Sequence, residues 1–229
     1  MSQGLPLVRC ALVARTYGDG PTATVALQAT DCEVFAGQRI GLVGPSGSGK
    51  STLLHLMAGL DDPTVGEVSW PAIGTRNELR PGRVAVIFQG PSLLPPLTVL
   101  ENASLPLIIG GMTDKKARVV AHAALRTLDL DELADKLPEE ISGGQAQRVA
   151  VARALAGEPS LILADEPTGQ LDRASGAAVV DVLLAASEHV GSALVISTHD
   201  RTVAERLPER WEMRSGEIQT DSRETTWSR

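Results

Sequence analysis

A glycine-rich segment at residues 44–52 constrains the fold of this chain more than any other stretch. It fits the pattern G-x-x-x-x-G-K-[ST], with an apolar run at 39–43 before it and a helical pattern after it. Glycines let backbone N–H groups turn inward around an anion without Cβ clashes, and a helix N-terminus attracts negative charge. Strand, loop and helix in this order predict an α/β fold that binds the phosphates of a nucleotide.

The loop combines backbone donors with side chains that have separate tasks. We expect Lys50 to reach the β- and γ-phosphates and the hydroxyl of Ser51 to bind Mg²⁺. The loop residues predicted to bind the nucleotide are Gly44, Pro45, Ser46, Gly47, Ser48, Gly49, Lys50, Ser51 and Thr52. The loop alone leaves kinases, GTPases and ATPases open.

Two adjacent acids follow a second apolar run. Residues 161–164 are apolar, and Asp165 and Glu166 come directly after them. Carboxylates at the end of a buried strand are costly to desolvate unless they act on a metal or a water. Adjacent strand residues point to opposite sides, so we expect Asp165 to hold Mg²⁺ through its coordination shell and Glu166 to polarise the attacking water. The pair narrows the prediction to ATP hydrolysis.

Short β-rich runs alternate with longer helical patterns, which is typical of an α/β sheet. Near-continuous apolar runs suit a sheet covered on both faces, and they lie at 39–43, 84–88, 161–164 and 193–197. Segment 5–33 predicts antiparallel strands joined by a turn. Helices are predicted over 113–128, 145–156 and 172–190.

The order of these elements predicts a helical block inserted into the α/β core. We expect one nucleotide-binding domain over 4–220, divided into a core and a helical subdomain. The core is expected over 1–89 and 159–220, the helical subdomain over about 90–158, and a polar tail over 221–229.

Residues 141–150 resemble the signature motif of ABC-type ATPases. They run Ile-Ser-Gly-Gly-Gln-Ala-Gln-Arg-Val-Ala, with Ile141 where the family most often has leucine. The small residues precede a helix predicted from Gln145, which makes a second helix N-terminal anion site. The resemblance implies a head-to-tail dimer in which each signature closes on the partner's γ-phosphate. The signature residues expected to act across that dimer are Ser142, Gly143, Gly144 and Gln145.

Other positions match landmarks of the same family. The resemblance implies that Gln89 senses Mg²⁺ and water, that His199 acts as the γ-phosphate switch, and that Asp172 contacts the partner subunit. Tyr17 resembles the aromatic residue that stacks on adenine. The alternatives are a structural histidine at a strand end for His199 and a tyrosine packed in a turn beside Gly18 for Tyr17.

Stretches 88–102 and 164–169 resemble ATPase subunits of lipoprotein-releasing, macrolide-exporting, peptide-resistance and cell-division ABC systems. Members of that group often transmit force to a membrane partner. The resemblance therefore implies an ATPase at the cytoplasmic face of the cell membrane, bound to a separate permease. An importer ATPase and a soluble ABC ATPase of DNA repair or translation are the alternatives.

The chain itself contains no run near the ~18 apolar residues that a membrane span needs. A permease helix is expected to dock on residues 93–97, with burial under the helical block as the alternative. Nucleic acid is not an expected partner, because the net charge is −7 and aromatic residues make up only 3% of the chain.

Segment 66–89 is shorter than the family pattern leads us to expect. Residues 70–81 are predicted to replace the usual strand and helical turn there, which would trim the edge of the antiparallel sheet.

Overall fold

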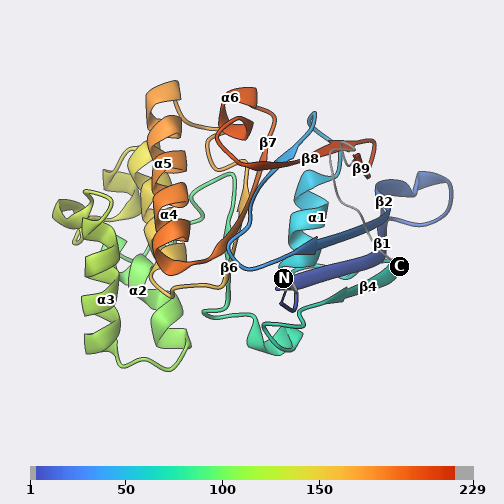
Figure 1. The fold of residues 1–229 in the computed structure, drawn as a ribbon. Coiled ribbons are helices and arrows are strands. Elements are labelled where there is room, and N and C mark those ends of the chain that lie inside the picture. Colours follow the sequence, from blue (N-terminus) through green and yellow to red (C-terminus); the bar gives the residue numbers. More distant parts are fainter. Residues whose placement is uncertain (1–3, 220–229) are drawn as a thin grey trace.

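The computed structural model describes residues 4–219, and a six-stranded sheet lies at its centre (Figure 1). Its strand order is β5-β6-β7-β3-β8-β9, with parallel pairing from β5 to β8 and an antiparallel β9 at the edge. The strands are β3 (Arg39–Val43), β5 (Val84–Ile87), β6 (Leu161–Asp165), β7 (Ala193–Thr198), β8 (Glu209–Arg214) and β9 (Glu217–Gln219). The polar tail predicted at 221–229 lies outside the described residues.

The central strands are largely apolar because both faces of the sheet are covered. Along β6, Leu161 and Leu163 belong to one hydrophobic core, whereas Ile162 and Ala164 belong to another. Alternate strand residues point to opposite faces, so each strand contributes side chains to both cores. The sheet predicted from the apolar runs is confirmed.

One face of this sheet packs on helix α1 (Lys50–Met57) and on a smaller antiparallel sheet. That sheet has the order β2-β1-β4 and consists of β1 (Val8–Tyr17), β2 (Thr24–Val34) and β4 (Val65–Ser69). Figure 1 shows α1 between the two sheets. The phosphate loop therefore starts a helix that is enclosed by both sheets.

The other face carries the remaining helices. They are α2 (Val99–Ile109), α3 (Asp114–Arg126), α4 (Gly143–Leu155), α5 (Arg173–Val190) and the short α6 (Arg201–Ala204). Helix α4 begins two residues before the predicted start at Gln145, because the hydroxyl of Ser142 accepts a hydrogen bond from the Gln145 N–H and caps the first turn. The α/β architecture with an antiparallel sheet and an inserted helical block is confirmed.

The prediction for segment 70–81 is wrong for the helical turn. A 3₁₀ turn forms at Arg76–Glu78, and Thr75 donates from both its N–H and its hydroxyl to the Glu78 carboxylate. The same segment closes the C-terminal end of α1, since the indole N–H of Trp70 donates to the carbonyl of Met57 at 2.8 Å. The segment is compact and satisfies the carbonyl groups that a helix end leaves free.

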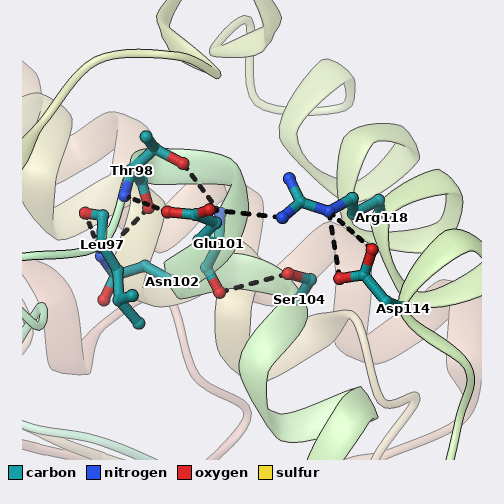
Figure 2. Close-up of polar contacts among 7 residues, drawn as sticks. All are labelled: Leu97, Thr98, Glu101, Asn102, Ser104, Asp114 and Arg118. Atoms are coloured by element: carbon teal, nitrogen blue, oxygen red, sulfur yellow. Dashed lines mark hydrogen bonds and ion pairs between the residues drawn. The ribbon is translucent and has the colours of Figure 1, made fainter.

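A buried asparagine connects helix α2 to the loop that precedes it (Figure 2). The side-chain amide of Asn102 donates to the carbonyls of Leu94, Leu97 and Thr98, and its oxygen accepts from the Leu94 N–H. Glu101 completes the cap by accepting from the Thr98 N–H, and Arg118 of α3 binds its carboxylate. These contacts hold residues 94–98 against the helical block.

We expect Asn102→Ala to lower the free energy of unfolding by roughly 2–3 kcal/mol, because buried backbone groups lose their partners. Urea unfolding of the full chain measures this difference. The exposed Asn77 provides the matched control, and Asn77→Ala should change stability by less than about 0.5 kcal/mol. Equal stability of the two variants would contradict the structural role of Asn102.

Candidate active site

The phosphate loop is surrounded so closely that two of its positions accept only glycine. A Cβ on Gly44 would lie 2.2 Å from the carbonyl oxygen of Met213, and one on Gly49 would lie 2.4 Å from that of Ala26. Gly47 has a φ of +76° and has no atom within 4 Å of its Cβ position. The loop is therefore pinned at both ends and open in the middle, which leaves space for an anion.

Two polar groups in this loop suit the phosphates of a nucleotide. Among residues 4–219, no hydrogen-bond partner reaches the buried hydroxyl of Ser48. The side chain of Lys50 is only 4% exposed, and its Nζ donates to the carbonyls of Gly44 and Pro45 at 2.9 and 3.0 Å. A cradle with an unpaired hydroxyl and a buried ammonium fits a bound polyphosphate.

Glu166 lies between a lysine and a histidine. Its Oε1 is 3.4 Å from the Nζ of Lys50, and its Oε2 is 3.2 Å from the Nδ1 of His199. Its φ of +43° is uncommon for a residue with a Cβ. A carboxylate in this position can take a proton from a water beside the phosphate loop.

His199 is mostly exposed and lines a cavity of about 460 Å³ next to the loop. Gly44 and Pro45 line the same cavity, together with Arg201 of α6 and Arg214 of β8. The end of β7 therefore brings His199 to the phosphate loop, beside a cavity whose walls carry both cationic and anionic side chains.

Asp165 is buried at the end of β6, and its Oδ1 accepts a 2.6 Å hydrogen bond from the hydroxyl of Ser197. Ser197 also accepts from the backbone N–H of Glu166 at 3.0 Å, so one side chain orients both acids. No sequence pattern predicts a role for Ser197, although it begins the Ser-Thr-His-Asp run at the end of β7.

The predicted Mg²⁺ ligands are all oxygen donors. Ser51 lies in the first turn of α1, Asp165 ends β6, and Gln89 follows β5. Within the described residues no group of three or more His, Cys, Asp and Glu residues is placed to hold a metal. A hydroxyl, an amide and a carboxylate that share the ion with substrate phosphates suit Mg²⁺, which rarely uses an all-protein cage. The donor set therefore fits this metal.

Gln89 and Asp172 lie beside other parts of the predicted site. The side-chain amide nitrogen of Gln89 packs against Gly169, where an added Cβ would lie 3.2 Å from it. Asp172 caps helix α5 by accepting from the backbone N–H of Ala174 and from Ser175, whose hydroxyl lowers the pKa of the Asp172 carboxyl most. Ser175 also lies next to Gly144, so it joins the Asp172 turn to the signature.

The signature and the phosphate loop lie on different faces of the central sheet. Leu53 of α1 belongs to the core shared with the antiparallel sheet, whereas Val149 of α4 belongs to the core under the helices. Ser142 and Gly143 at the start of α4 are exposed. One chain therefore does not bring the two anion sites together.

Tyr17 lies at the end of β1, next to the turn in which Gly18 has a φ of +74°. The residue is 41% exposed, and its hydroxyl donates to Asp61 at 2.8 Å. The side chain is therefore not buried in the turn, and the available surface of the ring can take a flat ligand.

A family model and several individual proteins are similar to this chain. A family model described as "ABC transporter" matches residues 27–169. The "Lipoprotein-releasing system ATP-binding protein LolD" of Legionella pneumophila (strain Paris) is 42% identical over 200 residues, which cover 84% of this chain and 88% of that protein. The protein of the same name from Xanthomonas campestris pv. campestris (strain 8004) is 38% identical, with 94% and 93% covered.

A solved structure has the same fold as this chain. The "Dimeric structure of a post-hydrolysis state of the ATP-binding cassette MJ0796 bound to ADP and Pi" superimposes with a TM-score of 0.84 at 36% identity. The superposition covers 93% of this chain and 97% of that one.

Proposed function

Because this chain belongs to the ABC transporter family and is an ATP-hydrolysing subunit within it, we propose that it drives a separate membrane permease of the lipoprotein-releasing type. The observation that carries the proposal is the 38–42% identity to the lipoprotein-releasing relatives over 84–94% of the chain. Its location would be the cytoplasmic face of the membrane, through the permease. Within residues 4–219 no helix combines the length and apolarity needed to cross a bilayer.

The proposed reaction is an in-line attack of water on the γ-phosphate of ATP. The loop amides and Lys50 hold the β- and γ-phosphates, and the γ-phosphate replaces Glu166 as the anion beside the ammonium. Glu166 accepts a proton from the water while the water oxygen bonds to the γ-phosphorus. The bond from that phosphorus to the bridging oxygen breaks, and the bridging oxygen leaves on ADP. His199 keeps the carboxylate oriented. Mg²⁺ held by Ser51, Gln89 and Asp165 would neutralise charge that develops on the phosphates.

We propose that a second copy completes the site. Because α1 and α4 pack on opposite faces of the sheet, the exposed N-terminus of α4 can reach a γ-phosphate only in another chain. A head-to-tail dimer places Ser142, Gly143, Gly144 and Gln145 of each copy over the ATP of its partner, with Asp172 at the contact between them.

The permease is proposed to dock in a groove between the central sheet and the helical block. A cavity of about 570 Å³ lies there, lined by the segment before β5, the second half of α2 and the end of α4. Its walls are apolar except for Arg80 and Arg153, and burial lowers the pKa of both guanidinium groups. Leu94 to Pro96 are exposed near α2, whereas Leu93 packs on the core, so only part of the predicted segment 93–97 is available.

We expect an amphipathic permease helix with an acidic residue to suit this groove, because it would bury apolar surface and pair with the arginines. Ile109 is 66% exposed on the rim, so a charge there should not disturb folding. Ile109→Asp should reduce co-purification with a co-expressed permease of the lipoprotein-releasing type by roughly tenfold or more. ATP hydrolysis by the isolated chain should not change.

Val119 of α3 provides a matched control, since it is also 66% exposed and does not line the groove. Val119→Asp should bind the permease normally. Normal binding by the Ile109 variant, or equal losses in both variants, would exclude the groove as the docking site.

A further inference from the structure

A charged network surrounds Tyr17 at the end of β1. The tyrosine hydroxyl donates to Oδ2 of Asp61 at 2.8 Å. Arg15 donates from Nε to the same oxygen at 3.0 Å and from a terminal nitrogen to Oδ1 at 2.8 Å. The guanidinium carbon of Arg15 also lies 4.6 Å from the centroid of the Tyr17 ring. Asp61 thus binds the rim of the ring and the cation that covers its face.

The positions of the three residues explain this geometry. Arg15 and Tyr17 are two residues apart on β1, so their side chains point to the same side of the strand. Asp61 belongs to the turn that follows α1, whose first residue is Lys50 of the phosphate loop. The network therefore ties the aromatic ring to the C-terminal end of the helix that begins at the phosphate site.

The network is charged at neutral pH. Burial raises the pKa of the Asp61 carboxyl, but the hydrogen bonds from Tyr17, the Asp62 N–H and Arg15 outweigh it and hold the pKa below its ordinary value. The contact with Tyr17 and the carboxylate of Asp61 raise the pKa of Arg15 above its ordinary value. An ionised pair is the arrangement that a bidentate arginine–carboxylate contact favours.

We propose that Arg15 and Asp61 are positioning residues that hold one face and the rim of the Tyr17 ring, so that its other face stacks on the adenine of ATP. This inference rests on the proposed ATP site. A fixed ring loses less side-chain freedom on binding than a mobile one, and the cation on the far face strengthens the platform. The network should affect ligands that carry a base and should not affect those that consist of phosphate alone.

The test compares binding of MgATP and of magnesium tripolyphosphate to the full chain by calorimetry. We expect Asp61→Asn to weaken ATP binding roughly three- to tenfold and to leave tripolyphosphate binding unchanged. In steady-state hydrolysis the same loss should raise KM and leave kcat unchanged. Tyr17→Phe keeps the ring and the Arg15–Asp61 ion pair but removes the hydroxyl, so it should reproduce part of the Asp61→Asn effect.

The double variant Asp61→Asn/Tyr17→Phe should lose less ATP affinity than the product of the two single losses, because both changes disturb the Tyr17–Asp61 contact. Asp62→Asn is the matched control. Asp62 is the next acid along the chain, is exposed, and pairs with Arg76 rather than with Tyr17. Its variant should bind both ligands as the unmodified chain does.

Three results would overturn the inference. Equal losses for ATP and tripolyphosphate would show that Asp61 only supports α1. Tighter ATP binding by Arg15→Ala would show that the guanidinium occupies the face that adenine needs. Unchanged ATP binding by Tyr17→Ala would remove the platform itself. Failure of the unmodified chain to bind either ligand would instead count against the ATP site as a whole.

Discussion

Replacing Glu166 with glutamine is expected to trap an ATP-bound dimer with little turnover. Glutamine keeps the size of the side chain but cannot accept the proton of the attacking water, so hydrolysis should slow by roughly 10²–10⁴-fold. Removing the negative charge also leaves Lys50 and His199 without an anion between them, which favours the γ-phosphate in that place. Phosphate release measures the turnover, and size-exclusion chromatography with ATP measures the dimer.

Glu67 provides a control for this experiment, because it is an exposed glutamate on β4. Glu67→Gln should hydrolyse ATP at the rate of the unmodified chain. In size-exclusion chromatography with ATP it should show the same oligomeric state as that chain. A Glu166→Gln protein with normal turnover would exclude Glu166 as the base.

Replacing Lys50 with alanine is expected to abolish most ATP binding. The ammonium is almost fully buried and its nearest neighbours are two carbonyls and one carboxylate, so a phosphate at this position meets a desolvated positive charge. Charge-assisted hydrogen bonds of this kind are each worth about 1.5–3 kcal/mol, and we expect a loss of roughly 100-fold in affinity. A nucleotide-binding isotherm for the full chain measures it.

The removal of a buried charge can also affect folding, so Lys50→Met serves as a second variant of similar volume. Both variants should bind ATP more weakly. Their urea unfolding midpoints should shift no more than ordinary single substitutions shift them. Lys115→Ala, at an exposed lysine of α3, should bind ATP normally. An unchanged isotherm for Lys50→Met would refute the role of the ammonium.

The central sheet is predictable from the sequence because its signal is local. Residues 161–164 are apolar at every position, and this pattern occurs when alternate side chains enter two different cores. The phosphate loop is likewise a local signal, because its glycines at 44 and 49 and the lysine at the helix start lie within nine residues. The 3₁₀ turn at 76–78 differs from the prediction, because a single turn has no apolar periodicity and is marked only by the contact of Thr75 with Glu78.

The site was only partly predictable, because its supports come from distant parts of the chain. Ser197 orients Asp165 and Glu166 from a neighbouring strand, 32 and 31 residues away respectively. Asp61 reaches Tyr17 across 44 residues. Neither contact has a periodicity or a motif that a sequence pattern can reveal, since each depends on the strand order and on where α1 ends.

The sequence by itself determined the strand–loop–helix order, the two acids after a buried strand and the glycine-rich start of α4, since each depends on spacing and residue type. Only the tertiary structure decided that Lys50 and His199 converge on Glu166, and that α1 and α4 pack on opposite faces of one sheet. Backbone propensity acts over a few residues, whereas burial of two apolar cores sets which distant segments meet.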